Sequence, residues 1–498
     1  MQTNYQEYKR QLQKIADVRM AAAVLNWDQE TYLPSKAAGI RAQQLSSLSG
    51  IAHEMFTDKA FGEILQALNQ ANAELSEKEL SNVKLSLEDY IREQKYPTEW
   101  VIRLSQTIAE AYHNWVAARE NHDFQQFAPS LAKLVDMKRE EAKMLGYKEH
   151  PYDALLNLYE PGLTTAEMTR VFDSVKEPLK ALLAKINTQK QVNDDFMRET
   201  YDKDKQWEFG MKLLKNIGFD FEAGRQDLSI HPFTTNFAPS DVRLTTKVDE
   251  EDFNAMTWSC LHEGGHGLYE QGLPEEEYGL PGGEAVSLGI HESQSRLWEN
   301  MVGRSLTYWK CHYSSLQEQF PEALKRVTLE DFYAAMNKVE PSFIRIEADE
   351  LTYHFHVLIR FEIEKALIEG SLEVAQIPEA WNAKYKEYLG VEVPNDLKGC
   401  LQDIHWSHGS FGYFPTYSIG SFYAAQFFYY AEQAIPELAS QLESGHCATL
   451  LGWLRENIHQ YGRQYTADEL CQRIGGESLN PTYFLNYAEA KYKAIYSF

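Results

Sequence analysis

Residues 262–266 read His-Glu-Gly-Gly-His, a spacing that allows two imidazoles to bind one metal ion. On a helix, residues four apart share a face, so His262 and His266 can direct ring nitrogens at the same point. Glu263 lies beside the first ligand, where its carboxylate can take a proton from a metal-bound water, whose pKa zinc lowers to about 7. The spacing therefore predicts a zinc hydrolase site. The alternative is a helix that carries two histidines on a partly exposed face.

The residues around this pattern favour a helix with defined ends. Residues 249–252 are all acidic, which suits the positive N-terminal end of a helix dipole. Gly272 and Pro274 are a stop signal shortly after the second histidine. Gly264 and Gly265 each cost about 1 kcal/mol relative to alanine in a helix. We therefore expect another backbone, or the substrate, to approach closely at these two glycines.

A catalytic zinc site needs a third protein ligand and an open position for water. The glutamates that follow the pattern are Glu270, Glu275, Glu276, Glu277, Glu284, Glu292 and Glu299. We predict Glu292, because residues 287–298 predict a second helix at a suitable distance along the chain. That helix is expected to bury Leu288, Leu297 and Trp298. Glu284, which follows the loop signal Pro281-Gly282-Gly283, is the alternative ligand.

The composition is that of a globular protein and excludes some partners. Hydrophobic residues make up 44% of the 498 residues and charged residues 24%. The formal net charge of -25 argues against nucleic acid or an anionic membrane surface as the main partner. The five cysteines are scattered, so they indicate neither a disulfide framework nor a thiolate zinc site. Residues 1–5 carry no signal-peptide apolar region and no run reaches about 18 apolar residues, so we expect a cytoplasmic protein.

Helical signals dominate the rest of the chain. Residues 5–25, 37–55, 351–367 and 422–435 have apolar residues three and four apart, which predicts helices. Residues 27–34 are expected to break the first two of these helices. There is no internal repeat, low-complexity segment or Gly/Ser-rich linker. We therefore predict one continuous, mostly α-helical domain over residues 1–498.

Residues 227–248 are the main exception to the helical pattern. Residues 228–230 and 242–246 have the β-branched alternation of strands, with prolines and an aspartate between them. We predict a small antiparallel β-sheet just before the metal-site helix. Its edge is suited to hold an extended peptide by strand addition. The alternative is a loop held to the core by Phe233 and Phe237.

Several motifs of the sequence together resemble those of a known family. The zinc pattern, followed by His-Glu-Ser-Gln at residues 291–294, resembles the M32 metallocarboxypeptidases, the carboxypeptidase Taq family. Further family signatures occur in the same order along the chain. They are WDQET within residues 27–34, HPF at 231–233, DVRLT at 241–245, IRIEAD at 344–349 and GCLQDIHW at 399–406. The resemblance therefore covers nearly the whole chain.

The resemblance implies a fold and an activity. The fold is a large, two-lobed helical body with a deep substrate groove. The activity is release of single residues from the carboxyl terminus of peptides, with broad specificity and poor cleavage next to proline. The resemblance also implies one zinc ion per chain, replaceable by cobalt, and a homodimer.

A carboxypeptidase needs a cation that binds the free α-carboxylate of its substrate, and the planar fork of arginine suits this role. In the family pattern Arg345 is the leading candidate and Arg243 the second. For each, the alternative is an ion pair within the protein. Such a pair would involve Asp349 or Glu347 for Arg345, and Asp241 for Arg243.

The resemblance also indicates groups around the reacting carbonyl. His405 and Tyr417 are candidate hydrogen-bond donors to the tetrahedral oxyanion. Asp403 is a candidate for orienting a neighbouring group. His231 precedes a proline and is expected either to shape the closed end of the groove or to cap a turn.

Two other functions are compatible with the same zinc site. An endo-oligopeptidase or dipeptidyl carboxypeptidase on a related helical scaffold would keep the metal ligands but lack a carboxylate clamp. A non-catalytic, zinc-stabilised binding protein is disfavoured by Glu263, since a structural site gains nothing from a general base.

Overall fold

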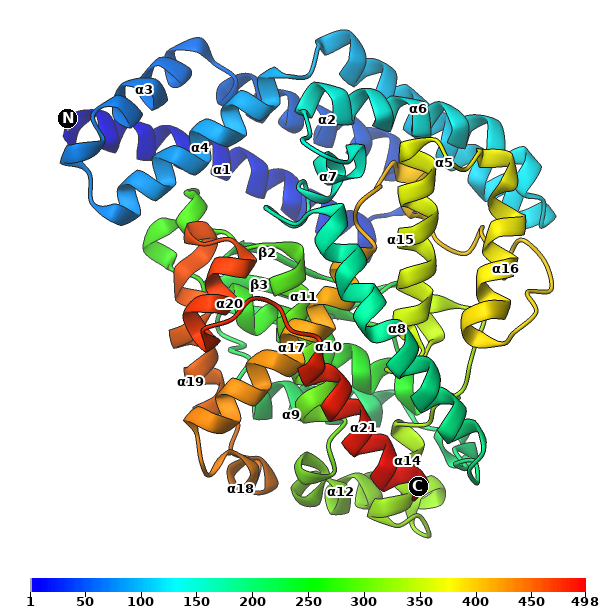
Figure 1. The fold of residues 1–498 in the computed structure, drawn as a ribbon. Helices are drawn as coiled ribbons and strands as arrows, with labels where there is room; N and C mark the ends of the chain where they lie inside the picture. Colours follow the sequence, from blue (N-terminus) through cyan, green and yellow to red (C-terminus); the bar gives the residue numbers. More distant parts are fainter. Residues whose placement is uncertain (1) are drawn as a thin grey trace. The chain divides into compact units, whose positions relative to one another are not determined.

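The computed structural model describes residues 2–498 and leaves Met1 outside the description. As predicted, the chain is mostly α-helical, with one small sheet (Figure 1). Two compact units share the chain: unit 1 is residues 1–94, 193–336 and 427–478, and unit 2 is residues 95–192, 337–426 and 479–498. Among the described residues, no helix has both the length and the apolar character needed to cross a membrane.

Unit 1 carries the predicted metal pattern and the sheet. Its principal helices and strands are α1 (Gln2–Thr31), α2 (Ala38–Phe56), α3 (Lys59–Gln70), α4 (Glu77–Gln94), α9 (Lys203–Ile217), β1 (Gly224–Leu228), β2 (Thr234–Ala238), β3 (Asp241–Thr246), α10 (Phe253–Glu270), α11 (Leu288–Arg296), the π-helical segment η7 (Leu297–Gly303), α12 (Leu306–Gln319), α13 (Pro321–Leu324), α14 (Leu329–Met336), α18 (Leu438–Glu443), α19 (Ala448–Asn457) and α20 (Ala467–Gly475).

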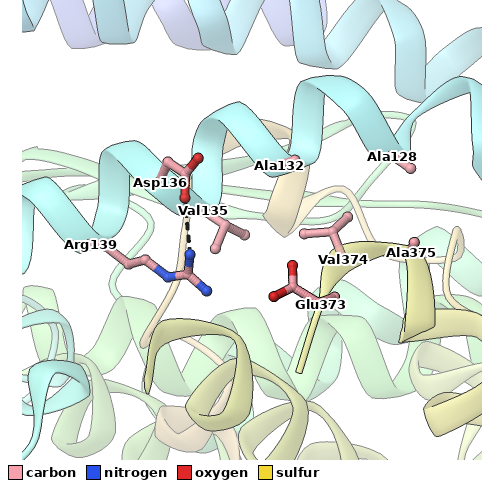
Figure 2. Close-up of a pocket in the computed structure, with 8 residues that line it drawn as sticks. All are labelled: Ala128, Ala132, Val135, Asp136, Arg139, Glu373, Val374 and Ala375. Carbon is pink, nitrogen blue, oxygen red and sulfur yellow. Dashed lines mark hydrogen bonds and ion pairs between the residues drawn. The ribbon is translucent and has the colours of Figure 1, made fainter. Parts of the chain in front are cut away.

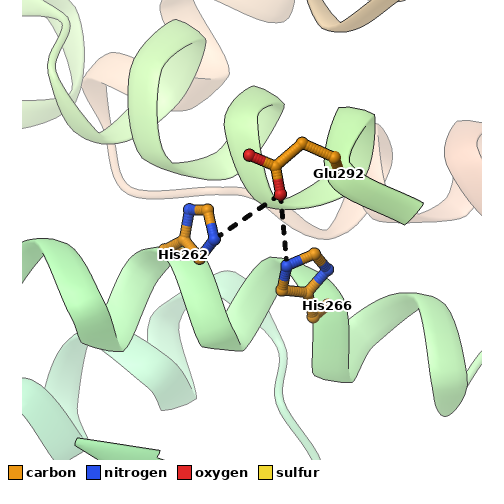
Figure 3. A group of neighbouring side chains, drawn as sticks. All are labelled: His262, His266 and Glu292. Atoms are coloured by element: carbon orange, nitrogen blue, oxygen red, sulfur yellow. Dashed lines mark ion pairs between the residues drawn. The ribbon is translucent and has the colours of Figure 1, made fainter. Parts of the chain in front are cut away.

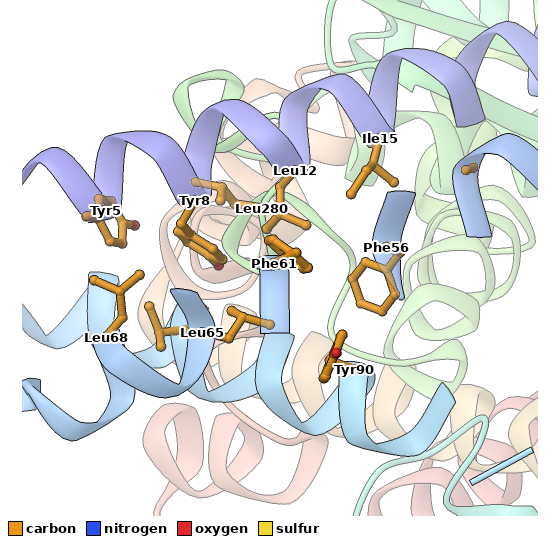
Figure 4. Packing of buried hydrophobic residues seen from close by; sticks show 12 residues of the cluster. Tyr5, Tyr8, Leu12, Ile15, Phe56, Phe61, Leu65, Leu68, Tyr90 and Leu280 are labelled. Atoms are coloured by element: carbon orange, nitrogen blue, oxygen red, sulfur yellow. The ribbon is translucent and has the colours of Figure 1, made fainter. Parts of the chain in front are cut away.

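The first four helices of unit 1 enclose an apolar cluster (Figure 4). Helix α1 contributes residues three and four apart, a spacing that places them on one face of a helix. Aromatic rings of α1, α2, α3 and α4 contact one another inside this cluster. Its members are Tyr5, Tyr8, Leu12, Ile15, Ala52, Phe56, Phe61, Leu65, Leu68, Val83, Tyr90 and Leu280.

The predicted sheet is present but has one more strand than expected, in the order β1-β3-β2. Strand β3 matches the prediction for residues 242–246 and pairs antiparallel with β2, as expected of this sheet. The prediction that residues 228–230 form a strand antiparallel to residues 242–246 was wrong, because β1 ends at Leu228 and pairs parallel with β3. Ile230 lies beyond the strand and is 78% exposed. The alternative, a loop over residues 227–248 held to the core by Phe233 and Phe237, was wrong, since this segment contains β2 and β3.

Helix α10 presents the His-Glu-x-x-His pattern and is packed on several sides. Asp252 caps it by accepting a hydrogen bond from the Asn254 backbone N–H (3.0 Å), and the helix ends before Gly272, as predicted. A Cβ on Gly265 would lie 2.6 Å from the backbone of α11, at the Gln294 carbonyl oxygen. A Cβ on Gly264 would lie 2.6 Å from the side chain of Leu214 in α9. The expected close neighbours of the two glycines are therefore the flanking helices.

Unit 2 has α-helices and short 3-10 helices, and its described residues form no strand. Its α-helices are α5 (Thr98–Asn121), α6 (Ala128–Leu145), α7 (Pro151–Leu156), α8 (Thr165–Asn187), α15 (Tyr353–Glu369), α16 (Ile377–Leu389), the first part of α17 (Pro415–Ala434) and α21 (Thr482–Tyr496). Helix α15 matches the segment predicted at 351–367 to within two residues at each end, and α17 contains the segment predicted at 422–435 except for its last residue. In unit 1, α1 and α2 likewise match their predictions. The break between them is shorter than expected, because α1 continues to Thr31.

Candidate active site

The structure brings together the three residues predicted to bind a metal (Figure 3). His262 and His266 project from one face of α10, and Glu292 projects toward them from α11. The Glu292 Oε2 lies 3.7 Å from His262 Nε2 and 3.5 Å from His266 Nε2. Glu284, the alternative ligand, forms an ion pair with Arg463 (2.8 Å) and is outside this cluster.

The donor set fits a tetrahedral metal ion. Ligand bonds of 2.0–2.2 Å at tetrahedral angles place neighbouring ligand atoms about 3.4 Å apart. The measured separations of 3.5 and 3.7 Å from Glu292 are close to that value. Glu292 forms ion pairs with both histidines at these distances, which are longer than ordinary hydrogen bonds and match the spacing of ligands around one ion (Figure 3). Two imidazole nitrogens and one carboxylate oxygen are also a usual ligand set for catalytic zinc.

The other nitrogen of each histidine ring is bonded on the side away from Glu292. His262 Nδ1 lies 3.0 Å from Glu299 Oε2, and His266 Nδ1 lies 2.5 Å from His291 Nδ1. His291 Nε2 in turn lies 2.7 Å from Glu270 Oε1. Partners of this kind fix the tautomer and orientation of metal-binding histidines. Both Nε2 atoms therefore remain available to an ion.

Arginines hold the acidic groups of the cluster in the ionised state. Burial opposes ionisation of Glu292, but Arg296 and the histidines outweigh it and hold the pKa of this carboxyl well below its usual range. Arg296 Nε donates to Glu292 Oε1 (2.6 Å) and also pairs with Glu299 (3.3 Å). Burial lowers the pKa of His266 to about 3, and His291 adds to the shift. The neutral imidazole and the ionised carboxylate are the forms that bind a metal.

Glu263, the predicted general base, is 7% exposed. Its Oε2 accepts a hydrogen bond from the Thr234 hydroxyl on β2 (2.6 Å). Burial raises the pKa of this carboxyl above its usual value, against the opposing effects of His262 and Thr234. Through its hydrogen bond to Glu263, Thr234 connects strand β2 of the sheet to the helix that carries the metal pattern.

The other predicted residues of unit 1 have mainly local partners. Arg243 binds both carboxylate oxygens of Asp241 (2.6 and 3.1 Å) and lies over the rings of Trp27 and Phe237. This is the ion pair considered as the alternative to substrate binding. His231 is exposed, and its carbonyl oxygen accepts a hydrogen bond from the Ser229 hydroxyl (2.6 Å), which stabilises the turn before β2.

The predicted residues of unit 2 form a second cluster, although they are far apart in sequence. Arg345 is 5% exposed and pairs with Asp403 (2.9 Å), and its Nη1 donates to the Tyr353 hydroxyl (2.9 Å). Arg360 binds the other oxygen of Asp403 (2.6 Å), so one carboxylate is shared by two guanidinium groups. Asp403 is thus the partner of Arg345, where the sequence had suggested Asp349 or Glu347.

His405 and Tyr417 belong to the same cluster. The His405 Nε2 lies 3.1 Å from the Tyr417 hydroxyl oxygen, and the Tyr417 ring lies below the Arg345 guanidinium at 4.7 Å. Burial lowers the pKa of His405 to about 3, so its imidazole is neutral at physiological pH. A neutral imidazole and a phenol are both able to donate a hydrogen bond.

The roles of several residues near the site were not predicted from the sequence. Glu270 and Glu299 were considered as metal ligands, but each bonds a histidine ring instead. His291 was noted only as part of the family signature. Thr234 and Asn236 were not singled out, because β2 was not predicted. Glu270 lies four residues after His266, a spacing that places both side chains on one face of the helix. This spacing was the available sequence signal that Glu270 lies near the metal pattern.

A separate pocket of about 330 Å³ lies in unit 2, between α6 and the short helix η9 (Val374–Gln376) (Figure 2). Its charged residues have partners within the protein, since Arg139 pairs with Asp136 (3.0 Å) and donates to the Leu367 carbonyl. No predicted site residue lines it. The lining consists of Ala128, Ala132, Val135, Asp136, Arg139, Glu373, Val374 and Ala375.

A helical fold with two histidines and a glutamate poised for one ion defines the class of metal-dependent hydrolases. Residues 7–492 match the carboxypeptidase Taq (M32) metallopeptidases, and the chain belongs to this family of metallocarboxypeptidases. Thermostable carboxypeptidase 1 of Thermus thermophilus is 41% identical over 99% of this chain and 98% of that protein. Carboxypeptidase 1 of Bacillus subtilis is 36% identical over 99% of both chains. The crystal structure of the M32 carboxypeptidase from Deinococcus radiodurans R1 has a TM-score of 0.98 at 38% identity, covering 100% of both chains.

Proposed function

We propose that this metallocarboxypeptidase uses zinc held by His262, His266 and Glu292, one ion per chain, with cobalt able to replace it. The observation that carries the proposal is the convergence of two Nε2 atoms and Oε2 at the spacing of tetrahedral ligands. A bound zinc ion supplies Lewis-acid chemistry, which polarises a carbonyl and lowers the pKa of water to about 7.

Glu263 is the general base of the proposed reaction. Its carboxylate takes a proton from the attacking water and returns it to the departing amine nitrogen. Two features support this role: Glu263 follows the first ligand on α10, and Thr234 holds one of its oxygens in place. The other oxygen is left for proton transfer.

Arg345 binds the α-carboxylate of the substrate in this proposal, and Arg243 is the second candidate. Arg345 and Arg360 together carry one more positive charge than Asp403 neutralises, which favours an additional carboxylate. His405 and Tyr417 share one hydrogen bond (3.1 Å), and the proton that this bond leaves free on the pair is donated to the developing oxyanion. His231 shapes the end of the substrate site.

The family resemblance supports the finer features of the proposal. These are release of single carboxyl-terminal residues with broad side-chain tolerance, poor cleavage next to proline, and a homodimer. We place the protein in the cytoplasm, since its five cysteines are free thiols. The two units are proposed to make one peptidase domain over residues 1–498, because each is assembled from three separate segments.

The proposal is tested with two peptides of one sequence, the first with a free carboxyl terminus and the second amidated. Zinc-loaded protein is expected to shorten the free peptide by one residue at a time, as followed by mass spectrometry, and to leave the amidated peptide intact. Release of dipeptides would identify a dipeptidyl carboxypeptidase. Internal cleavage of both peptides would identify an endo-oligopeptidase.

A further inference from the structure

The strand β2 lies alongside the helix that carries the metal pattern. It is an edge strand of the sheet, pairs antiparallel with β3, and packs against α10. Thr234 and Asn236 are two residues apart, so their side chains leave the strand on the same face. Both side chains donate hydrogen bonds to glutamates of α10, Thr234 to Glu263 and Asn236 to Glu270.

The Thr234 hydroxyl lies 2.6 Å from Glu263 Oε2 and 3.1 Å from the Glu263 carbonyl oxygen. It has a single proton, and the shorter contact assigns that proton to the carboxylate. A glutamate side chain has several rotatable bonds, and this anchor at one oxygen restricts the direction in which the other oxygen points. Such restriction matters because proton transfer requires the base within hydrogen-bond reach of its partner.

Asn236 acts on the metal ligand His266 through two intervening groups. A histidine that binds a metal through Nε2 carries its proton on Nδ1, which His266 donates to His291 Nδ1 (2.5 Å). His291 must then carry its own proton on Nε2, which it donates to Glu270 Oε1 (2.7 Å). The remaining oxygen, Glu270 Oε2, accepts from the Asn236 amide. Each hydrogen bond in this series has one donor and one acceptor. The hydrogen bonds that connect Asn236 to His266 can therefore all form at the same time.

We propose that β2 is a positioning strand for both parts of the catalytic centre. Thr234 orients the general base Glu263, and Asn236 orients the ligand His266 through Glu270 and His291. This inference rests on the proposed function, since it assumes that Glu263 is the base. It assigns different consequences to two neighbouring residues on one strand face, and these consequences can be measured separately.

For Thr234, the test compares T234V, which keeps the shape but removes the hydroxyl, with T234S, which keeps the hydroxyl. T234V is expected to lower kcat by about 10- to 100-fold, with KM and zinc affinity unchanged, because only the base loses its anchor. T234S is expected to retain most of the turnover. Equal activity of T234V and the wild type, or equal loss in T234V and T234S, would overturn this role.

For Asn236, the test is the zinc affinity of N236L, measured by chelator competition without any substrate. N236L is expected to bind zinc about 10-fold or more weakly, the usual effect of losing a group that supports a metal ligand. Its kcat at saturating zinc is expected to stay within a few-fold of the wild type. Wild-type zinc affinity in folded N236L would refute the role of Asn236.

The matched control is T235V, on the same strand but on its opposite face. It is expected to change neither kcat nor zinc affinity. A loss in T235V equal to those in T234V and N236L would mean that β2 is merely fragile and would overturn the inference. Wild-type protein without peptidase activity would instead refute the proposed function and the role of Thr234, while the zinc measurement on N236L would still decide the role of Asn236.

Discussion

His262 is held between two glutamates from successive parts of the chain: its Nε2 faces Glu292 of α11, and its Nδ1 lies 3.0 Å from Glu299 of η7. Glu299 also pairs with Arg304 (3.0 Å) and Arg296 (3.3 Å). Burial opposes the ionisation of Glu299, but His262 and the two arginines outweigh it and keep the pKa of this carboxyl below its usual range. An ionised carboxylate behind a ligand histidine raises the basicity of the ring toward a metal.

Replacement of Glu299 by Gln is therefore expected to weaken zinc binding by about 10-fold or more. The amide oxygen can still accept from Nδ1, but it carries no charge. Chelator competition measures the affinity, and E318Q, at an exposed glutamate of α12, is the control. Zinc affinity equal in E299Q and E318Q would show that Glu299 only balances the charges of its arginines.

Replacement of Glu263 by Gln is expected to leave zinc bound while turnover falls by roughly two to four orders of magnitude, the usual contribution of general acid–base catalysis. The amide keeps the shape of the side chain but cannot take a proton. Metal analysis beside peptide-release kinetics checks both parts of this expectation. E251Q, an exposed glutamate just before α10, serves as the control, and near-normal turnover of zinc-loaded E263Q would contradict the assigned role.

Glu292 and Glu284 were the two candidates for the third ligand, and a pair of matched substitutions separates them. E292Q is expected to lower the zinc content of the purified protein, because the ligand oxygen loses its charge. E284Q removes only an ion pair with Arg463 and is expected to keep full zinc content. The opposite pattern in metal analysis would exclude Glu292 as the ligand.

Much of the candidate metal site could be predicted because the features that form it are local in sequence. The acidic cap at Asp252, the ligand spacing on α10 and the stop at Gly272 are all read within a few helical turns. Glu292 could be predicted as the third ligand because the residues around it predict a second helix after the metal pattern. The prediction that Leu288 is buried was wrong, because its side chain is 36% exposed, and a helical pattern does not show where the first turn emerges from the core.

The parts that could not be predicted depend on contacts between distant residues. Strand β2 has mixed polarity, lies between two prolines and is irregular near Ala238, so its local pattern resembles a loop. The parallel pairing of β1 with β3 is likewise decided by the fold and not by alternation within each strand. Segment η7 is π-helical, a difference that apolar spacing over so few residues does not reveal.

Replacement of Arg345 by Lys tests the proposed carboxylate clamp. Lysine keeps the charge but loses the planar fork, and Asp403 keeps Arg360 as a partner. We expect KM for peptides with a free carboxyl terminus to rise by about 10-fold or more, the usual effect of weakening a charged hydrogen bond. Thermal unfolding checks that the variant is folded. An unchanged KM would mean that Arg345 serves the buried ion pair alone.

Glu364 of α15 makes stability depend on pH. It is fully buried and accepts hydrogen bonds from the Tyr152 hydroxyl (2.5 Å), the Trp406 indole (2.9 Å) and the Gly412 backbone (2.9 Å). Burial nevertheless raises the pKa of this carboxyl from 4.5 to about 7. Between these pH values the folded protein keeps the proton that the unfolded chain has lost. The stability linked to this group is therefore fully present below pH 4.5 and is lost as pH rises through 7.

In E364Q this pH dependence is absent, because the amide does not titrate. The free energy of unfolding of the wild type, relative to E364Q, is expected to fall by about 3 kcal/mol between pH 4.5 and pH 7. A constant offset from altered hydrogen bonds does not affect this slope. Urea unfolding at several pH values measures it, with E379Q, at an exposed glutamate of α16, as the control. Parallel pH curves for the wild type and E364Q would show that Glu364 is ionised in the folded protein throughout this range, held so by its three donors.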